Sequence, residues 1–118
     1  MSTSHTVSFV RNQHGEQEVS EYLKRLARQR WTGGFEATEV LLRIAALEHT
    51  GPVGEPVLVI DETIALHALF YEVHVVIHAP HPQERDIFLL TAFREEDWER
   101  GIRRAEELAR RLFGLTIQ

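Results

Sequence analysis

The sequence predicts an α+β domain, in which a small antiparallel sheet packs against helices. Three observations lead to this class. The first half of the chain carries two stretches with apolar residues at helical spacing, the second half is a series of short apolar and β-branched runs separated by turn residues, and a last helical pattern closes the chain. The predicted order is β-α-α-β-β-β-α, with an N-terminal helical hairpin and a C-terminal helix gathered on one side of the sheet.

Length and composition indicate one folded domain. With 118 residues the chain can bury a single core, so we expect residues 1–118 to form one domain. Hydrophobic residues make up 43% and charged residues 26%, a balance typical of globular proteins rather than disordered chains. The longest apolar run, 87–92, is far shorter than the roughly 18 residues of a membrane span. The absence of cysteine excludes disulfides, thiolate metal sites and a thiolate nucleophile.

The overall charge bears on which classes of partner the protein can bind. The net charge is −5 with histidine neutral, from 13 basic and 18 acidic residues. Broad, non-specific binding of nucleic acid needs a basic surface, so this balance argues against it while leaving room for a local basic patch. Residues 1–5 have neither the basic start nor the apolar stretch of a secretory signal, and we therefore expect a cytoplasmic protein.

The first half of the chain predicts one strand and two helices. Residues 6–10 alternate between apolar and polar side chains, which indicates a short strand. Apolar residues then recur at helical spacing over 16–27 and again over 37–47. The glycine pair 33–34 separates the two stripes as a helix break, so the helices form a hairpin.

The second half predicts three strands, at 56–60, 64–77 and 86–94. Asp61-Glu62-Thr63 forms the first turn, and two prolines within 78–85 withdraw N–H groups and interrupt the sheet. The last strand is apolar on both faces over most of its length, which suits a central position.

A closing helix is predicted over 98–112, with its acids early and its arginines late, the order that the helix dipole favours. Trp98 begins this helix, and Trp31 lies beside the helical hairpin. We expect both tryptophans to pack against the protein rather than to stack on nucleic-acid bases.

The segment 68–78 carries the most informative polar pattern. In one continuous strand, Glu72, His74 and His78 fall on the face opposite the apolar set. A carboxylate and an imidazole two residues apart lie about 7 Å from each other along a strand, close enough to flank one substrate. The same pattern also fits a sheet face that is polar because it is exposed to solvent.

Standard signatures of metal or cofactor binding are missing. His74 and His78 lie roughly 13 Å apart along a strand, too far to bind one zinc ion, and the pair His78 and His81 is by itself a weak signal of a metal site. The chain has no phosphate-binding loop, dinucleotide fingerprint or nucleophile elbow. We expect neither a metal nor another cofactor.

Arg94 ends the predicted central strand. Pockets often open at the ends of sheets, and the planar guanidinium group suits a phosphate. The acids of 95–97 follow directly and can pair with this arginine instead. Residues 94–112 contain six arginines and six acids, so a solvated, charge-balanced helix face also explains the pattern.

Three segments, "FYEVHVVIHA", "DIFLLTAFRE" and "ERGIRRAEELARRL", resemble in their order the RelE/ParE toxin superfamily and its HigB-like, phage-derived group. In that family the last strand commonly ends in an apolar-Phe-basic pattern, here Phe93-Arg94. The resemblance implies a RelE-like fold and the toxin component of a type II toxin–antitoxin system. Such a toxin is a ribosome-dependent endoribonuclease that cuts mRNA and is silenced by a cognate antitoxin.

The resemblance also implies roles for individual residues. Arg94 would stabilise the charge that develops on the phosphate. His74 or His78 would act as general base or acid, with Glu72 on the same face. The residues expected to hold the RNA are Arg103, Arg85 and Tyr71.

Two departures from the family's pattern keep other functions open. Glu95 stands where a second basic residue is common, and the whole chain is acidic. The alternatives are a non-catalytic module on the same fold, which binds a protein or forms a homodimer, and a gyrase-targeting ParE-like toxin. The expected partners are an antitoxin and, for an active enzyme, the ribosome and mRNA, with no role for a membrane.

Overall fold

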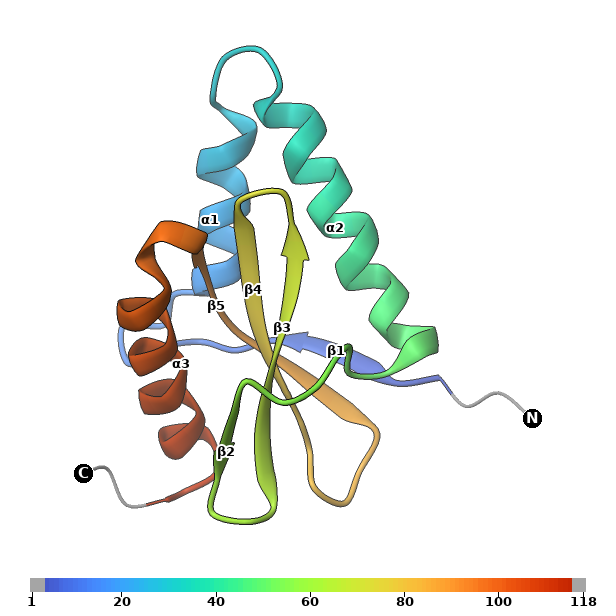
Figure 1. Cartoon of the computed structure of the whole chain (residues 1–118), viewed down its shortest axis with the longest axis vertical. Coiled ribbons are helices and arrows are strands. Elements are labelled where there is room, and N and C mark those ends of the chain that lie inside the picture. The colour runs from blue at the N-terminus through green and yellow to red at the C-terminus, as the bar shows by residue number, and fades with distance from the viewer. Residues whose placement is uncertain (1–3, 116–118) are drawn as a thin grey trace.

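A computed structural model describes residues 4–115. Residues 1–3 and 116–118 lie outside this part, together with most of the segment on which the expected cytoplasmic location rests. The described chain forms the following elements (Figure 1): β1 (Thr6–Phe9), α1 (Glu18–Ala27), α2 (Gly33–Thr50), β2 (Leu58–Ile60), β3 (Ile64–Tyr71), β4 (His74–Pro80), β5 (Asp86–Arg94), the short 3-10 helix η1 (Glu95–Asp97) and α3 (Trp98–Leu112).

The strands form one sheet in the order β1-β5-β4-β3-β2. Strands β2 to β5 pair in antiparallel fashion, as predicted, and the α+β class is confirmed. The sheet is nevertheless mixed, because β1 lies parallel to β5. A parallel pair needs a long connection, and here the helical hairpin and three strands lie between the two partners.

The prediction of one strand over 64–77 is wrong, because the chain reverses within it. Tyr71 at the end of β3 pairs with His74 at the start of β4, and Glu72 and Val73 form the turn between them. Glu72 has a φ of 52°, in the left-handed region that non-glycine residues rarely adopt. The sequence hides this hairpin because the turn lacks the glycine, asparagine or proline that marks most two-residue turns.

Strand β4 also extends further than predicted. Instead of ending before His78, it pairs with β5 as far as Pro80, which lies opposite Ile87, and the register shifts between Ile77 and His78. Pro80 is the last residue of the strand, where a missing N–H interrupts little of the sheet. The second proline, Pro82, lies in the connection that follows.

Helices cover both faces of the sheet rather than one, as Figure 1 shows. The α1–α2 hairpin packs on one face and α3 on the other. The reason lies in β4, whose residues alternate between the two sides: Val75 and Ile77 pack with the α3 core, and Val76 packs with the hairpin core. A central strand that is apolar on both faces requires cover on both faces.

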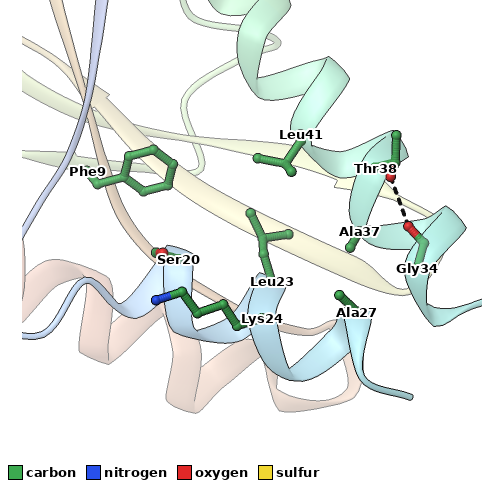
Figure 2. A pocket seen from close by; sticks show the side chains of 9 residues that line it. All are labelled: Phe9, Ser20, Leu23, Lys24, Ala27, Gly34, Ala37, Thr38 and Leu41. Carbon is green, nitrogen blue, oxygen red and sulfur yellow. Dashed lines mark hydrogen bonds between the residues drawn. The ribbon is translucent and has the colours of Figure 1, made fainter. Parts of the chain in front are cut away.

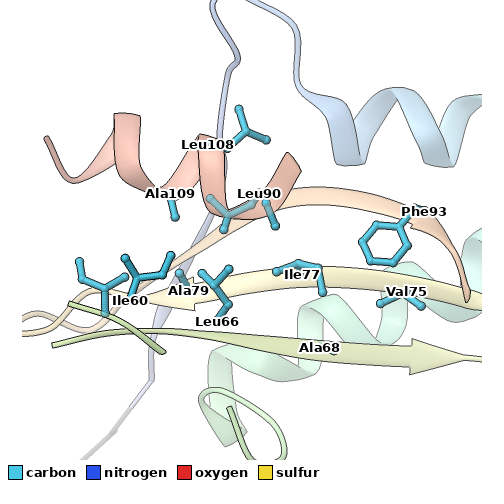
Figure 3. Close-up of a cluster of buried hydrophobic side chains, with 12 residues drawn as sticks. Ile60, Leu66, Ala68, Val75, Ile77, Ala79, Leu90, Phe93, Leu108 and Ala109 are labelled. Carbon is cyan, nitrogen blue, oxygen red and sulfur yellow. The ribbon is translucent and has the colours of Figure 1, made fainter. Parts of the chain in front are cut away.

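Each face has its own apolar core. Figure 3 shows the core under α3, formed by Ile60, Ile64, Leu66, Ala68, Val75, Ile77, Ala79, Leu90, Phe93, Ala105, Leu108 and Ala109. The core under the hairpin consists of Val19, Leu23, Val40, Ile44, Leu47, Leu69, Val76, Ile87 and Leu89. None of the helices within residues 4–115 is both long and apolar enough to cross a membrane.

The two tryptophans have different environments. Trp98 stacks on Phe70 with 5.9 Å between ring centroids and meets Phe93 edge to face, so its predicted packing role is confirmed. Trp31 is 97% exposed, and the prediction that it packs against the protein is wrong. It lies in the α1–α2 connection, where no apolar residue of the described chain covers it.

Gly101 sets how closely α3 approaches the sheet. A methyl group at this position would overlap the ring of Phe93, whereas at Gly34, in the first turn of α2, no atom lies within 4 Å. We predict that Gly101→Ala lowers the free energy of unfolding by about 1 kcal/mol or more, because overpacking costs about 1–3 kcal/mol and outweighs the gain of about 1 kcal/mol in helix propensity.

Urea denaturation of this variant beside Gly34→Ala measures the effect. The control should be as stable as the unmodified chain or slightly more stable, since it gains helix propensity without a clash. Equal stability of the two variants would contradict the close packing of α3 on Phe93.

Candidate active site

His74 begins β4 and is the best-connected polar residue of the sheet. Its side chain is 2% exposed and faces the helical hairpin. The Nδ1 atom lies 2.6 Å from the hydroxyl of Tyr22 in α1, and Nε2 lies 2.8 Å from Oε2 of Glu36 in α2. One imidazole therefore joins the central strand to both helices of the hairpin.

The chemistry of Tyr22 and Glu36 determines which ring nitrogen of His74 carries the proton. An ionised carboxylate only accepts hydrogen bonds, so Nε2 of His74 carries a proton and donates it to Glu36. In the neutral imidazole Nδ1 is then an acceptor, and the hydroxyl of Tyr22 donates to it. The order is that of a proton relay, from a phenol through an imidazole to a carboxylate.

The pKa values of the two partners move apart. The hydrogen bond from His74 lowers the pKa of Glu36 below its ordinary value, and this effect outweighs the opposing effect of burial. Burial raises the pKa of Tyr22 above its ordinary value, although the nearby charges of Arg94 and Arg25 act in the other direction. Around neutral pH the relay thus combines a protonated phenol with an ionised carboxylate.

Arg94 lies directly opposite His74 across the β4–β5 pair, so both residues are on the hairpin side of the sheet. Its side chain is 48% exposed, and its Nε donates to Glu96 at 3.1 Å. A hollow of about 310 Å³ opens here, lined by Val73, Arg94, Glu95 and Glu96. We call Tyr22, Glu36, His74 and Arg94 the tip cluster, after the end of the sheet at which they meet.

Tyr71 extends this cluster onto the neighbouring strand. It pairs with His74 in register, so Tyr71, His74 and Arg94 form a row across β3, β4 and β5. The guanidinium of Arg43 in α2 lies over the Tyr71 ring, 4.4 Å from its centroid. Glu72 follows in the exposed turn and is not part of the row.

His78 does not share a site with His74. The expectation that both histidines lie on an exposed face is wrong, because both are buried under the helical hairpin side of the sheet. The Nε2 atom of His78 accepts a hydrogen bond from the backbone N–H of Val53 at 3.4 Å, and its ring stacks on that of His67. Burial, and secondarily the charge of His67, lowers the pKa of His78 to about 4.

The two arginines expected to hold RNA lie away from the tip cluster. Arg85 is exposed in the connection between β4 and β5, at the opposite end of β5 from Arg94. Arg103 is exposed on α3, which covers the other face of the sheet. The structure brings together three of the seven residues expected at the site, namely Tyr71, His74 and Arg94.

Sequence reasoning missed Tyr22 and Glu36. Tyr22 falls in the apolar stripe of its helix, where an aromatic residue predicts packing, and Glu36 is one of several acids in the first turn of a helix. Their contacts with His74 span 52 and 38 residues, so no local spacing reveals them. The only available signal is chemical: a histidine in a strand buried on both faces requires polar partners from the covering helices.

A second polar group fastens α1 to α3. Glu18 at the start of α1 forms an ion pair with Arg104 of α3 and accepts hydrogen bonds from Asn12 and Thr91. Burial raises the pKa of Glu18, but the hydrogen bonds from Arg104, Asn12 and Thr91 together outweigh burial and lower this pKa below its ordinary value. Both carboxylate oxygens of Glu18 accept hydrogen bonds, so this group stabilises the contact between α1 and α3 rather than forming a reactive site.

Comparisons with known proteins add no assignment: neither models of known protein families nor curated protein sequences match this chain. Within the part of the chain that the structure describes, no group of three or more histidine, aspartate or glutamate residues is arranged to hold a metal ion.

The low pKa of His78 predicts a loss of stability in mild acid. Below pH 6.5 the unfolded chain binds a proton at this imidazole while the folded chain does not until about pH 4, so unfolding becomes easier as the pH falls through this window. The loss should approach about 3 kcal/mol at pH 4.

His78→Gln isolates this effect, since glutamine still accepts a hydrogen bond from Val53 but does not titrate. Urea denaturation from pH 7 to 4 should show a much flatter profile for this variant. His14→Gln, which replaces an exposed histidine in a turn, should keep the profile of the unmodified chain. Identical profiles for all three proteins would contradict the neutral, buried state of His78.

Proposed function

We propose that this protein is a RelE-like toxin, a ribosome-dependent endoribonuclease that cuts mRNA. The observation that carries the proposal is the tip cluster, in which a Tyr22–His74–Glu36 relay lies beside an arginine on the adjacent strand. Cleavage by an internal 2′-hydroxyl requires a proton acceptor and a cation for the phosphate, and this cluster offers both at one end of the sheet. The Phe93-Arg94 strand end supports the same family, whereas the element order has one strand more than the predicted β-α-α-β-β-β-α pattern.

In the proposed reaction, the RNA 2′-oxygen attacks the adjacent phosphorus as its proton passes to the Tyr22 oxygen, while the Tyr22 proton passes to Nδ1 of His74. Glu36 stabilises the imidazolium that results. The bond between phosphorus and the 5′-oxygen breaks, the leaving oxygen takes a proton from water, and the hydroxide that remains takes the imidazolium proton back through Tyr22. The products are a 2′,3′-cyclic phosphate and a 5′-hydroxyl, with no change in oxidation state.

Arg94 supplies the positive charge in this proposal. Its present partner, Glu96, has a side chain that is 72% exposed, so the ion pair is well screened by solvent and is weakly held. A phosphate bears charge on several oxygens and accepts two parallel hydrogen bonds from a guanidinium. The bound RNA backbone therefore displaces Glu96 from Arg94 as it enters the hollow.

The proposed partners follow from the same family. They are the mRNA and the ribosome that presents it, together with an antitoxin that silences the protein, in the cytoplasm. The net charge of −5 gives the chain little affinity of its own for free RNA, so the proposal requires the ribosome to present the mRNA.

A second candidate is a non-catalytic module that binds a protein or another copy of itself. Two observations favour it: His74 is 2% exposed behind Tyr22 and Glu36, and Arg94 already has an acidic partner. In this case the relay serves only to fasten the hairpin to the sheet, and its members matter for stability but not for any reaction.

Substitution within the tip cluster separates the two candidates. We predict that Tyr22→Phe and Arg94→Ala each lower mRNA cleavage in a reconstituted translation reaction at least about 100-fold, the usual lower bound for loss of a proton-transferring group or of charge stabilisation. Primer extension on the mRNA measures the cleavage, and thermal denaturation verifies that each variant remains folded.

Arg100→Ala is the matched control. Arg100 is also an exposed arginine paired with an acid of η1, Asp97, but it lies on α3 outside the tip cluster. It should cleave like the unmodified chain. If the unmodified chain leaves ribosome-bound mRNA intact, or if Arg94→Ala and Arg100→Ala cleave equally, the nuclease proposal fails and the binding module remains.

A further inference from the structure

Helix α2 is apolar on the side that faces solvent as well as on the side that faces the sheet. Val40, Ile44 and Leu47 are buried in the hairpin core, whereas Phe35 is 61% exposed and Leu42 is 59% exposed. The next residues on the solvent side, Ala45 and Ala46, are also exposed and uncharged. Glu39 and Arg43 form an ion pair on one flank of α2, so the exposed apolar residues beside them form a stripe rather than the whole solvent side. An exposed apolar stripe on a surface helix indicates that another protein surface covers it.

Trp31 adds an aromatic side chain in the α1–α2 connection, four residues before Phe35. It is 97% exposed and has a φ of 68°, in the left-handed region that costs a non-glycine residue on the order of 1 kcal/mol or more. No contact among the described residues offsets the cost of this backbone conformation. Exposed tryptophans of this kind are the residues that most often anchor protein interfaces.

A groove lies between α1 and α2, as Figure 2 shows. Gly34 and Leu41, which line it, directly precede the exposed Phe35 and Leu42 in the sequence. Its volume is about 290 Å³, enough to receive an aromatic side chain. Four residues form its α2 side, of which Leu41 is 46% exposed: Gly34, Ala37, Thr38 and Leu41. The remaining lining comes from Phe9 of β1 and from Ser20, Leu23, Lys24 and Ala27 of α1.

Charges of opposite sign flank the two ends of this surface. The segment 24–30 carries Lys24, Arg25, Arg28 and Arg30 and no acid. At the far end of α2, Glu48 is exposed. About 15 residues of helix, or about 22 Å, separate the basic end from the acidic end. Two such surfaces attract each other only when they run in opposite directions.

We propose that this surface is an isologous dimer interface, in which the α2 helices of two copies pack antiparallel about a two-fold axis. The surface is self-complementary, since it carries both the projecting side chains of Trp31 and Phe35 and the groove between α1 and α2. The two-fold axis brings Trp31 and Phe35 of each copy against Leu42 and the groove of the other. The same axis brings Arg30 of each copy beside Glu48 of the other. This charge pairing favours a second copy of the chain over an unrelated partner.

The proposal is independent of the proposed function. The groove and the solvent side of α2 face away from the sheet, whereas Glu36 and Tyr22 reach inward to His74. A nuclease and a non-catalytic module can both dimerise in this way, so failure of one proposal leaves the other standing.

Sedimentation equilibrium of the full chain tests the interface. The unmodified protein should have twice the 13.6 kDa mass of the chain at about 100 μM, where a dimer with a micromolar Kd is largely formed. Leu42→Glu should raise the Kd about 30-fold or more, as expected for loss of a central interface residue. Circular dichroism verifies that the variant keeps its helices.

Val59→Glu is the matched control for exposure. Val59 is 58% exposed, like Leu42, but it lies on the edge strand β2, which is the other surface through which two copies could pair. This variant should remain dimeric. A monomeric unmodified protein, or a dimer that is lost in Val59→Glu and kept in Leu42→Glu, would overturn the proposal.

A charge-reversal pair tests the antiparallel arrangement. Arg30→Glu and Glu48→Arg should each dimerise more weakly alone, since each places like charges together across the two-fold axis. Mixed in equal amounts, they should form a heterodimer at least about 10-fold tighter than either homodimer, because both contacts then join opposite charges. A mixture that is no tighter than the separate variants would contradict the proposed orientation.

Discussion

The constraint on which the structure depends is the burial of β4 on both faces. A strand in this position can be apolar throughout, yet β4 carries His74 and His78 toward the helical hairpin. Buried imidazoles require hydrogen-bond partners, and the covering layer supplies most of them: Tyr22 and Glu36 bond both ring nitrogens of His74, and the backbone N–H of Val53 bonds Nε2 of His78. Nδ1 of His78 is buried without a hydrogen-bond partner among the described residues. The two helices and the chain that follows α2 are thus positioned by the polar atoms of one strand as well as by apolar packing.

The same constraint gives the tip cluster its chemical character. His74 is too enclosed to meet a substrate itself, but its partner Tyr22 is only half-buried and Arg94 on the next strand is exposed. A buried imidazole between a phenol and a carboxylate can transmit a proton without contacting the reacting atoms. The relay therefore joins a structural role, holding the hairpin on the sheet, to the reactive role that the nuclease proposal assigns to it.

Local patterns in the sequence predicted the α+β class, the helix over 98–112 and the strand over 86–94 with its observed limits, because periodicity determines such elements. They failed where the structure of a segment depends on residues far away in the sequence. The turn at Glu72 carries no turn residue and is imposed by the pairing of β3 with β4, and the placement of α3 follows from apolar residues on the second face of β4. Tyr22 and Glu36 reach His74 across 52 and 38 residues, beyond any spacing rule.

The most direct test of this account is the protonation pattern of the His74 ring, observed in long-range 15N–1H correlation spectra of the full chain. A proton on Nε2, and an Nδ1 resonance that changes in Tyr22→Phe, are predicted because Glu36 accepts from the first nitrogen and Tyr22 bonds to the second. A ring that lacks a proton on Nε2, or whose spectrum matches that of the exposed His14, would contradict the central place given to this histidine.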